Sequence, residues 1–123
     1  MASIQRIGFT RYQNDVSKIF KALGHPARIA IIDKLISHER IMCKELAIDL
    51  KLTLPTISRH LQVLMETGII GYEKSSNVSY YVVNPILVQK AKEALGDVCN
   101  KAENHPVNYR NVIFSEQPFQ DSF

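Results

Sequence analysis

The sequence predicts a mainly α-helical domain that carries one small β-hairpin. Apolar residues recur every three or four positions over residues 16–67 and again over residues 85–98, which is the spacing of amphipathic helices. Between these stretches, residues 69–83 are rich in Ile, Val and Tyr and contain a polar Ser-Ser-Asn, which is typical of two strands joined by a turn. The 123 residues suit one domain with a modest core, and we expect residues 1–103 to form it and residues 104–123 to form a tail or arm.

The first half of the domain is predicted to hold three helices. The first runs over residues 16–23 and ends at Gly24. Pro26 suits the first position of the second helix, because its missing N–H would have no intrahelical partner there, and the apolar residues that follow predict a helix that is almost wholly core. A third, short helix is expected over residues 44–50.

A fourth helix follows after a three-residue connector, and the third and fourth helices match a helix-turn-helix. Thr53 is a good N-cap for residues 54–66, since its hydroxyl can accept a bond from a free N–H of the first turn, and Gly68 stands just past the end. In a helix-turn-helix the second helix lies in the DNA major groove. The hairpin, with its turn near residues 75–77, would then be a wing, which predicts a winged helix-turn-helix.

The helix over residues 54–66 has two chemically different faces. At 100° per residue, Ile57, Leu61 and Leu64 fall within one narrow arc that faces the core. The far side carries hydroxyl, guanidinium and amide groups, which suit phosphates and base edges. Lys and Asn at the hairpin tip can add charge and hydrogen bonds along the DNA backbone or in the minor groove. The alternative interpretation is an ordinary solvated helix face beside a solvated turn.

The last helix is predicted to start with Asn84 as its cap and Pro85 as its first residue. No clear period follows it in residues 104–123. One apolar stripe runs along this helix and consists of Leu87, Ala91, Ala94, Leu95 and Val98.

Three segments together carry a family resemblance. They read FKALGHPARIAIIDKL, CKELAIDLKLTLPTISRHLQVLMETGII and, at the end of the hairpin, SYYVVNP. Over about residues 16–100 the chain resembles the ArsR/SmtB family of prokaryotic winged-helix repressors. The resemblance implies a homodimer formed through the first and last helices, which binds an inverted-repeat operator in double-stranded DNA and leaves it when an inducer binds.

The resemblance also implies site residues. His60 borders the inward face of its helix, so packing against neighbours and contact with DNA both remain open for it. The expected DNA contacts are Thr53, Thr56, Ser58, Arg59, His60 and Gln62 on the helix and Lys74 and Asn77 on the wing. The expected dimer contacts are Val16, Ile19, Phe20, Leu87, Ala91, Leu95 and Val98.

The family's sensor motifs are incomplete in this chain. Many members bind metal or metalloid ions through a motif resembling ELCVCDL, and here RIMCKEL keeps only Cys43, because Ile41 stands at the first cysteine. One thiolate does not make the site that arsenite, cadmium or lead needs. On the last helix, Asp97, Cys99 and a later His105 are a fragment of the family's zinc site. We expect no required cofactor and no sensing by the thiols; a metal-responsive or redox-responsive repressor that uses Cys43 or Cys99 is the alternative.

Composition and motifs bear on three other classes of function: protein binding, catalysis and membrane association. The net charge of +3 is compatible with a polyanionic partner, but it is mild enough to leave open a winged-helix module that binds another protein. The sequence shows no Gly-rich phosphate loop, HExxH or GxSxG, so we do not expect an enzyme. No apolar run approaches the roughly 18 residues that cross a bilayer and no signal peptide is evident, so we expect no membrane partner and a cytoplasmic location.

Overall fold

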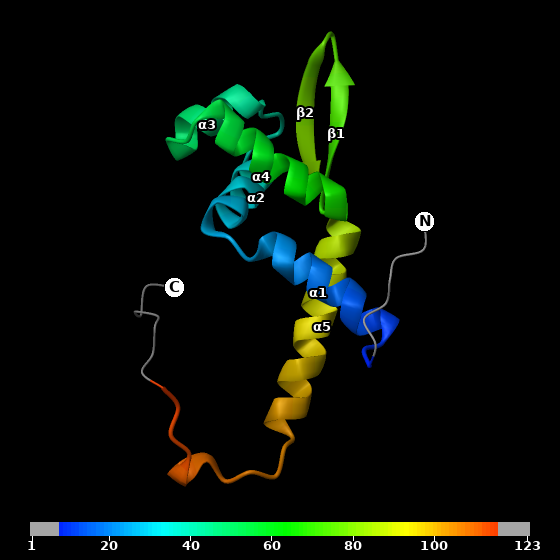
Figure 1. Cartoon of the computed structure of the whole chain (residues 1–123), viewed down its shortest axis with the longest axis vertical. Helices are drawn as coiled ribbons and strands as arrows, with labels where there is room; N and C mark the ends of the chain where they lie inside the picture. The colour runs from blue at the N-terminus through cyan, green and yellow to red at the C-terminus, as the bar shows by residue number, and fades with distance from the viewer. Residues whose placement is uncertain (1–7, 116–123) are drawn as a thin grey trace.

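The computed structural model describes residues 8–115, and these form helices around a small core with one projecting hairpin (Figure 1). Residues 1–7 and 116–123, which belong to the predicted domain and tail, lie outside the described residues. In chain order the elements are α1 (Arg11–Leu23), α2 (Pro26–Ser37), α3 (Cys43–Leu50), α4 (Leu54–Thr67), β1 (Ile70–Ser75), β2 (Val78–Val83), α5 (Pro85–Glu103) and the 3₁₀ turn η1 (Tyr109–Asn111).

Short polar side chains cap the N-termini of α1, α4 and α5, as the sequence predicted for α4 and α5. The Thr53 hydroxyl accepts from the Thr56 N–H at 3.3 Å, and the Asn84 side chain accepts from the Ile86 N–H at 3.0 Å. The helix α1 begins at Arg11, before the predicted start at Val16, because Thr10 and Gln13 form a capping box at its N-terminus. These caps satisfy backbone N–H groups that have no partner within a helix.

The turn between α3 and α4 depends on a left-handed residue. Lys51 has φ 56° and ψ 41°, and this reversal lets the Leu52 N–H donate to the Ala47 carbonyl at 3.0 Å. A left-handed conformation is uncommon for a residue with a Cβ. The tight turn brings α4 back across α3 and completes the helix-turn-helix.

The core is apolar throughout the described residues, where no polar or charged side chain is buried. The prediction that α2 is almost wholly core is wrong: Ile31 and Leu35 are buried, but Ile29 is 47% and Ile36 66% exposed. A core this small covers only one face of α2, since only part of a helix can face its neighbours. The largest fully buried side chains are Ile31, Ile41, Leu46, Ile57, Leu61, Leu64 and Ile69.

The hairpin of β1 and β2 is the wing. Its strands pair antiparallel from Ile70 opposite Val83 to Ser75 opposite Val78, with a two-residue turn between them. Both turn residues, Ser76 and Asn77, have positive φ, as a type I′ turn requires. At the base, the Asn84 N–H donates to the Ile69 carbonyl at 2.7 Å. The wing therefore projects from a fixed base beside α4 (Figure 1).

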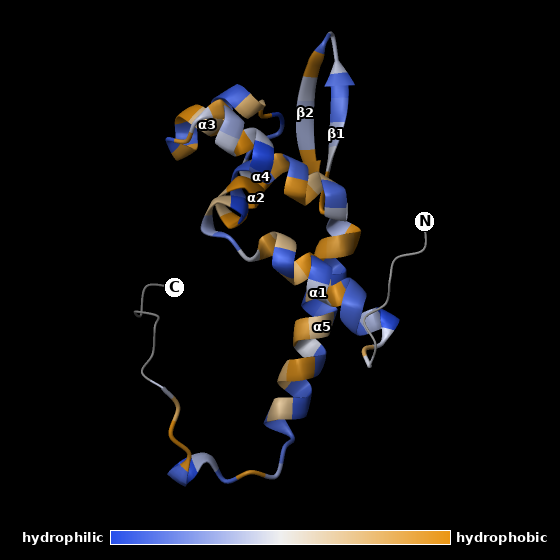
Figure 2. Cartoon of the chain, viewed as in Figure 1, coloured by the Kyte–Doolittle hydropathy of each residue, from blue (hydrophilic) through white to orange (hydrophobic). Residues whose placement is uncertain are grey.

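The helix α5 crosses α1 and then continues away from the winged part of the molecule (Figure 1). Figure 2 shows apolar and polar bands alternating along this free part of α5 and an apolar stretch in the segment beyond it. We call residues 104–115 the C-terminal arm; every one of them is exposed. No helix in residues 8–115 has the length and apolar character that a membrane crossing requires.

Candidate nucleic-acid interface

The two faces of α4 are separated as the sequence predicted. Ile57, Leu61 and Leu64 are at most 2% exposed and anchor the helix to the core. The opposite surface consists of Pro55, Ser58, Arg59 and Gln62, all of which are exposed. The core thus holds α4, the second helix of the helix-turn-helix, in place and leaves its outer face exposed.

Arg59 is the strongest base-reading candidate on this face. Arginine can bond bidentately to guanine, and neither of the two ion pairs within residues 8–115 uses Arg59. Gln62 can pair with adenine, although its amide here donates to the Glu66 carboxylate at 3.2 Å. DNA contact by Gln62 would require this weak, exposed bond to open.

The hydroxyl groups divide between structure and surface. Thr53 donates to the Thr56 hydroxyl at 2.8 Å, so these two predicted DNA contacts also hold the first turn of α4 together. Ser58 is exposed, with its Oγ 3.9 Å from the Cys43 Sγ at the start of α3. Of the three hydroxyls, Ser58 is the freest to meet a phosphate.

His60 is turned toward the protein. Its ring centroid lies 4.5 Å from that of His25, and the Arg28 Nε donates to the His60 Nδ1 at 3.4 Å. Desolvation lowers the pKa of His60, and the charges of His25, Arg28 and Arg59 lower it further. A neutral imidazole suits this place, because Nδ1 must stay unprotonated to accept from Arg28. Of the two roles that sequence left open for His60, packing is the one that this geometry supports.

Arg28 was not singled out from the sequence. Its guanidinium also donates to the carbonyl oxygens of Lys21 and Ala22, at 3.1 and 3.0 Å, which are the last carbonyls of α1. Arg28 therefore joins the end of α1 to His60 on α4. The sequence signal was the GHPAR segment itself, but spacing alone does not reveal a contact 32 residues away.

The wing presents Lys74 and Asn77 as predicted, since both are exposed near its tip. Tyr81 is partly buried against the core, and burial raises the pKa of its phenol, with the nearby Cys43 and Tyr72 adding to the shift. Tyr80 lies under Arg40, whose guanidinium carbon is 5.2 Å from the ring centroid. Stacking of this kind holds a cation beside the wing.

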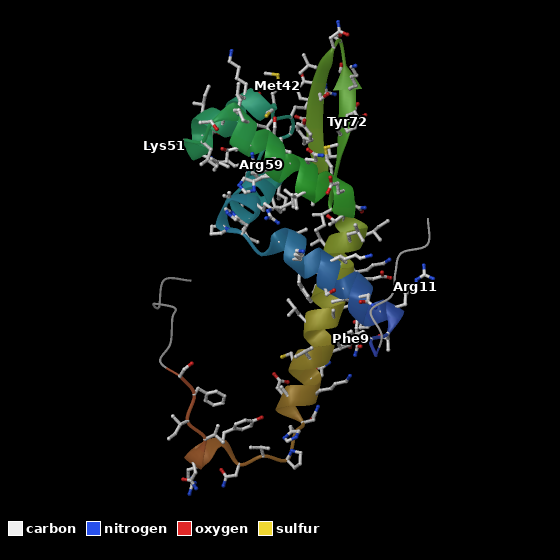
Figure 3. The ribbon with its side chains drawn as sticks, in the orientation of Figure 1. Phe9, Arg11, Met42, Lys51, Arg59 and Tyr72 are labelled. Atoms are coloured by element: carbon white, nitrogen blue, oxygen red, sulfur yellow. The ribbon has the colours of Figure 1, made fainter. Side chains whose placement is uncertain are left out.

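Two more cations flank the same surface and were not predicted as site residues. Lys44 and Lys51, at the start of α3 and at the turn after it, are both exposed. Figure 3 shows Lys51 and Arg59 in the same part of the molecule as Tyr72 on the wing, and Phe9 and Arg11 away from them, at the start of α1. Three exposed cations, Lys44, Lys51 and Arg59, thus lie on the helix-turn-helix, although the whole chain carries only +3.

The predicted dimer contacts fall into three groups by exposure. Ile19 and Ala91 are each only 6% exposed, so both belong to the core of the single chain. Val16, Phe20 and Leu87 are half-buried, whereas Leu95 and Val98 are exposed. A groove of about 420 Å³ lies between the first half of α1 and the last turns of α5. It is lined by Thr10, Tyr12, Gln13, Val16, Ser17, Phe20, Ala94, Asp97, Val98 and Lys101.

The predicted sensor residues lie apart from one another. Cys43 is half-buried at the start of α3, while Cys99 and Asp97 are exposed near the end of α5 and His105 is on the arm. Figure 1 places α3 and the end of α5 at opposite ends of the molecule, and both thiols are free. Within residues 8–115, no three His, Cys, Asp or Glu side chains gather as metal ligands would. The Cys99 thiol donates to Glu103, and this bond raises the pKa of Cys99.

Known proteins are similar to this chain in sequence and in fold. A family model described as a helix-turn-helix domain matches residues 23–71. An uncharacterised helix-turn-helix-type transcriptional regulator of Methanocaldococcus jannaschii is 40% identical over 68 residues, which span 54% of this chain and 75% of that protein. The transcriptional repressor SdpR of Bacillus subtilis is 26% identical over 89 residues, which span 72% of this chain and 98% of SdpR.

Solved structures have the same fold. The crystal structure of an ArsR family transcriptional regulator superposes with a TM-score of 0.68 at 23% identity and covers 79% of this chain and 99% of that one. The solution structure of a homodimeric winged helix-turn-helix domain from Mycobacterium bovis, a possible ArsR-family regulator, gives a TM-score of 0.59 at 19% identity and covers 84% and 99%. The predicted winged helix-turn-helix is therefore confirmed.

Proposed function

This chain belongs to the ArsR family of winged helix-turn-helix, DNA-binding transcriptional regulators, and from that premise we propose that it is a homodimeric repressor. It binds an inverted-repeat operator and leaves that operator when an inducer binds. The family and fold are those of DNA-binding regulators and not of enzymes. Its target is genomic DNA, so its place of action is the cytoplasm.

The observation that carries this proposal is the exposed face of α4 between the α3 turn and the wing. Its core-facing residues are buried, while Ser58, Arg59 and Gln62 are free to meet DNA. In the proposed complex Arg59 and Gln62 meet base edges, and Ser58 and the N-terminal N–H groups of α4 meet phosphates. Lys74 and Asn77 follow the backbone beside the wing.

Two copies are needed because one α4 reads only a few base pairs. An inverted repeat presents two half-sites roughly 34 to 36 Å apart, one helical turn of DNA, and a symmetric dimer presents its reading helices at a matching distance. A small change at the seam of α1 and α5 would move these helices out of register. Control of the repressor therefore belongs at that seam.

The test is a fluorescence titration of labelled DNA from just upstream of the protein's own gene, repeated over a series of salt concentrations. We expect tight binding whose logarithmic affinity falls linearly with the logarithm of salt, since each neutralised phosphate releases counterions. A scrambled duplex of equal length is the control and should bind more weakly. Absence of binding at every salt concentration would contradict the proposal and favour a winged-helix module that binds a protein.

The inducer, in this proposal, acts elsewhere than on the two thiols. Support comes from the separation of Cys43 and Cys99 along the molecule and from Glu103, which disfavours the Cys99 thiolate that a soft metal would bind. We expect reduced, oxidised, zinc-treated and arsenite-treated protein to bind the operator alike, and Cys43→Ser with Cys99→Ser to leave every curve unchanged. Loss of binding in one state, restored by either substitution, would identify a thiol sensor instead.

A further inference from the structure

We propose that the C-terminal arm packs on a second copy of this chain, over the outer end of the seam formed by α1 and α5. This inference rests on the proposed homodimer. It assigns residues 104–115 a binding role: the arm of each copy occupies the groove of the other copy.

The arm is rich in apolar side chains that its own chain leaves uncovered. Ile113 is 93% and Phe114 70% exposed, and Val107, Tyr109 and Val112 are also exposed. Five large apolar residues within eight positions are more than scattered surface residues, and a contiguous apolar patch usually marks an interaction site. The described part of the same protomer leaves them exposed, and in this proposal the second copy covers them.

The arm also has local order that groups these side chains. Asn108 caps the turn η1 by accepting from the Arg110 N–H at 3.0 Å, and the rings of Tyr109 and Phe114 lie 6.4 Å apart in a stacked arrangement. Figure 1 shows the arm leaving the lower end of α5, running to one side of it and then turning upward at a distance from both α5 and α1. The apolar side chains of the arm are therefore left uncovered by α1 and α5 of the same protomer, and two of them, Tyr109 and Phe114, are already grouped.

The receiving surface is the groove between α1 and α5. Its floor and walls include apolar side chains from both helices, Tyr12 and Phe20 from α1 and Val98 from α5. Asp97 and Lys101 line the same groove, and Asp97 can meet Arg110, the cation of the arm. Val98 and Phe20 are shared with the predicted dimer seam, but Tyr12, near the start of α1, is not among the predicted dimer contacts and is 57% exposed, so the groove lacks a cover there.

Continuity and reach favour a second copy as the partner. The exposed Leu95 and Val98 lie on the predicted dimer helix immediately before the arm, so the apolar surface of the seam continues into the arm. Even with the short turn η1 in it, a twelve-residue arm, which would span at most about 40 Å if fully extended, is long enough to cross a neighbouring helix roughly 10 to 12 Å wide. In a two-fold dimer each arm meets the other protomer's groove, so both grooves are filled by the same contact.

The first test compares two full-length variants by analytical ultracentrifugation. Phe114→Asp should raise the dimer dissociation constant at least about tenfold, because a buried phenyl group would be replaced by a charge. Ile36→Asp is the matched control: Ile36 is 66% exposed on α2, away from the seam, and the dissociation constant should stay within about twofold. A dimer as tight in Phe114→Asp as in the wild type would overturn the arm contact while leaving the homodimer intact.

The second test identifies the partner directly. A photo-crosslinking phenylalanine analogue at position 114 is placed in isotopically heavy full-length protein, which is mixed with light protein that lacks the analogue. We expect heavy-to-light crosslinks to peptides of α1 or the end of α5. Crosslinks confined to heavy peptides of the same chain, or to neither helix, would overturn the proposal. A wild-type protein that stays monomeric in the first test would overturn both this inference and the proposed homodimer.

Discussion

Arg59 and His60 are adjacent in the sequence and serve different partners. The Arg59 side chain is exposed on the outer face of α4, whereas the His60 ring lies against His25 and Arg28. A rotation of 100° along the helix accounts for this difference, since it moves one side chain to the surface and the next to the protein. Substitutions at these two neighbours should therefore affect different properties.

Arg59→Ala should weaken operator binding without changing the fold. Loss of a bidentate contact to a base costs about 1 to 3 kcal/mol and relaxes specificity at one base pair. The measurement is a fluorescence titration against the operator and against operators substituted one base pair at a time. Arg11→Ala is the matched control, because the side chain of Arg11 is 87% exposed at the start of α1, away from α4 and the wing. Equal losses in the two variants would mean that Arg59 contributes only general charge.

His60 should make the stability of the protein depend on pH. Its pKa in the folded chain is lowered, chiefly by burial, so the unfolded chain takes up this proton more readily. Stability is then full above the unfolded pKa of about 6.5 and declines as the pH falls through that value. Urea unfolding between about pH 7.5 and 5.5 measures the decline.

The His60→Gln variant should show a shallower decline over the same pH range, since Gln has no proton to gain. His105→Gln, on the exposed arm, should keep the wild-type dependence. A His60→Gln curve parallel to the wild type would show that another group carries the pH dependence.

At the scale of elements, Gly68 ends α4 and sets the direction in which the chain enters the wing. Its φ of +81° is unfavourable for any residue with a Cβ, and an added Cβ would lie 3.3 Å from the Cδ1 of Leu87. Gly68→Ala should destabilise the protein by about 1 to 2 kcal/mol, seen as a lower Tm. Gly71→Ala, at the second residue of β1 where an added Cβ would meet nothing within 4 Å, should change the Tm less. A Tm unaffected by Gly68→Ala would mean that the turn adapts without strain.

Helix starts and ends could be predicted from sequence because their causes are local. Pro26, Thr53, Gly68 and Asn84 each act on backbone groups within a few residues, and the structure has a boundary at each of them. The exposure of Ile29 and Ile36 could not be predicted, since the apolar period of α2 does not say how much of its circumference the other helices cover.

The candidate site divides in the same way. The outward direction of Arg59 follows from helical periodicity, which is local. The bond from Arg28 to His60 joins residues that no periodic rule connects, and the left-handed Lys51 lacks the usual Gly or Asn signal. Such features arise from the packing of α1, α2 and α4 against one another, so they cannot be predicted from a local sequence pattern.

At the scale of the whole molecule, DNA affinity should depend on the dimer. Val98→Asp places a charge on the exposed seam of α5, so it should weaken dimerisation strongly but leave the single chain folded. We expect the affinity for a full inverted repeat to fall much more than the affinity for one half-site. Analytical ultracentrifugation and binding titrations on both duplexes measure this, with circular dichroism as the folding control.

The opposite result is equally informative. If Val98→Asp dimerises as well as the wild type, the seam does not include this face of α5. If dimerisation is lost while the full repeat is still bound at wild-type affinity, the two protomers read DNA independently.

The division of α4 into buried and exposed faces bears on how such a regulator diversifies. Exposed substitutions usually change stability by less than about 0.5 kcal/mol, so Ser58, Arg59 and Gln62 can vary while Ile57, Leu61 and Leu64 keep the helix in place. After gene duplication, one copy can acquire specificity for a new operator by substitutions on this face, and every intermediate variant stays folded. Because substitutions on this face leave the fold intact, the face is a suitable place to engineer several repressors that do not bind one another's operators in a single cell.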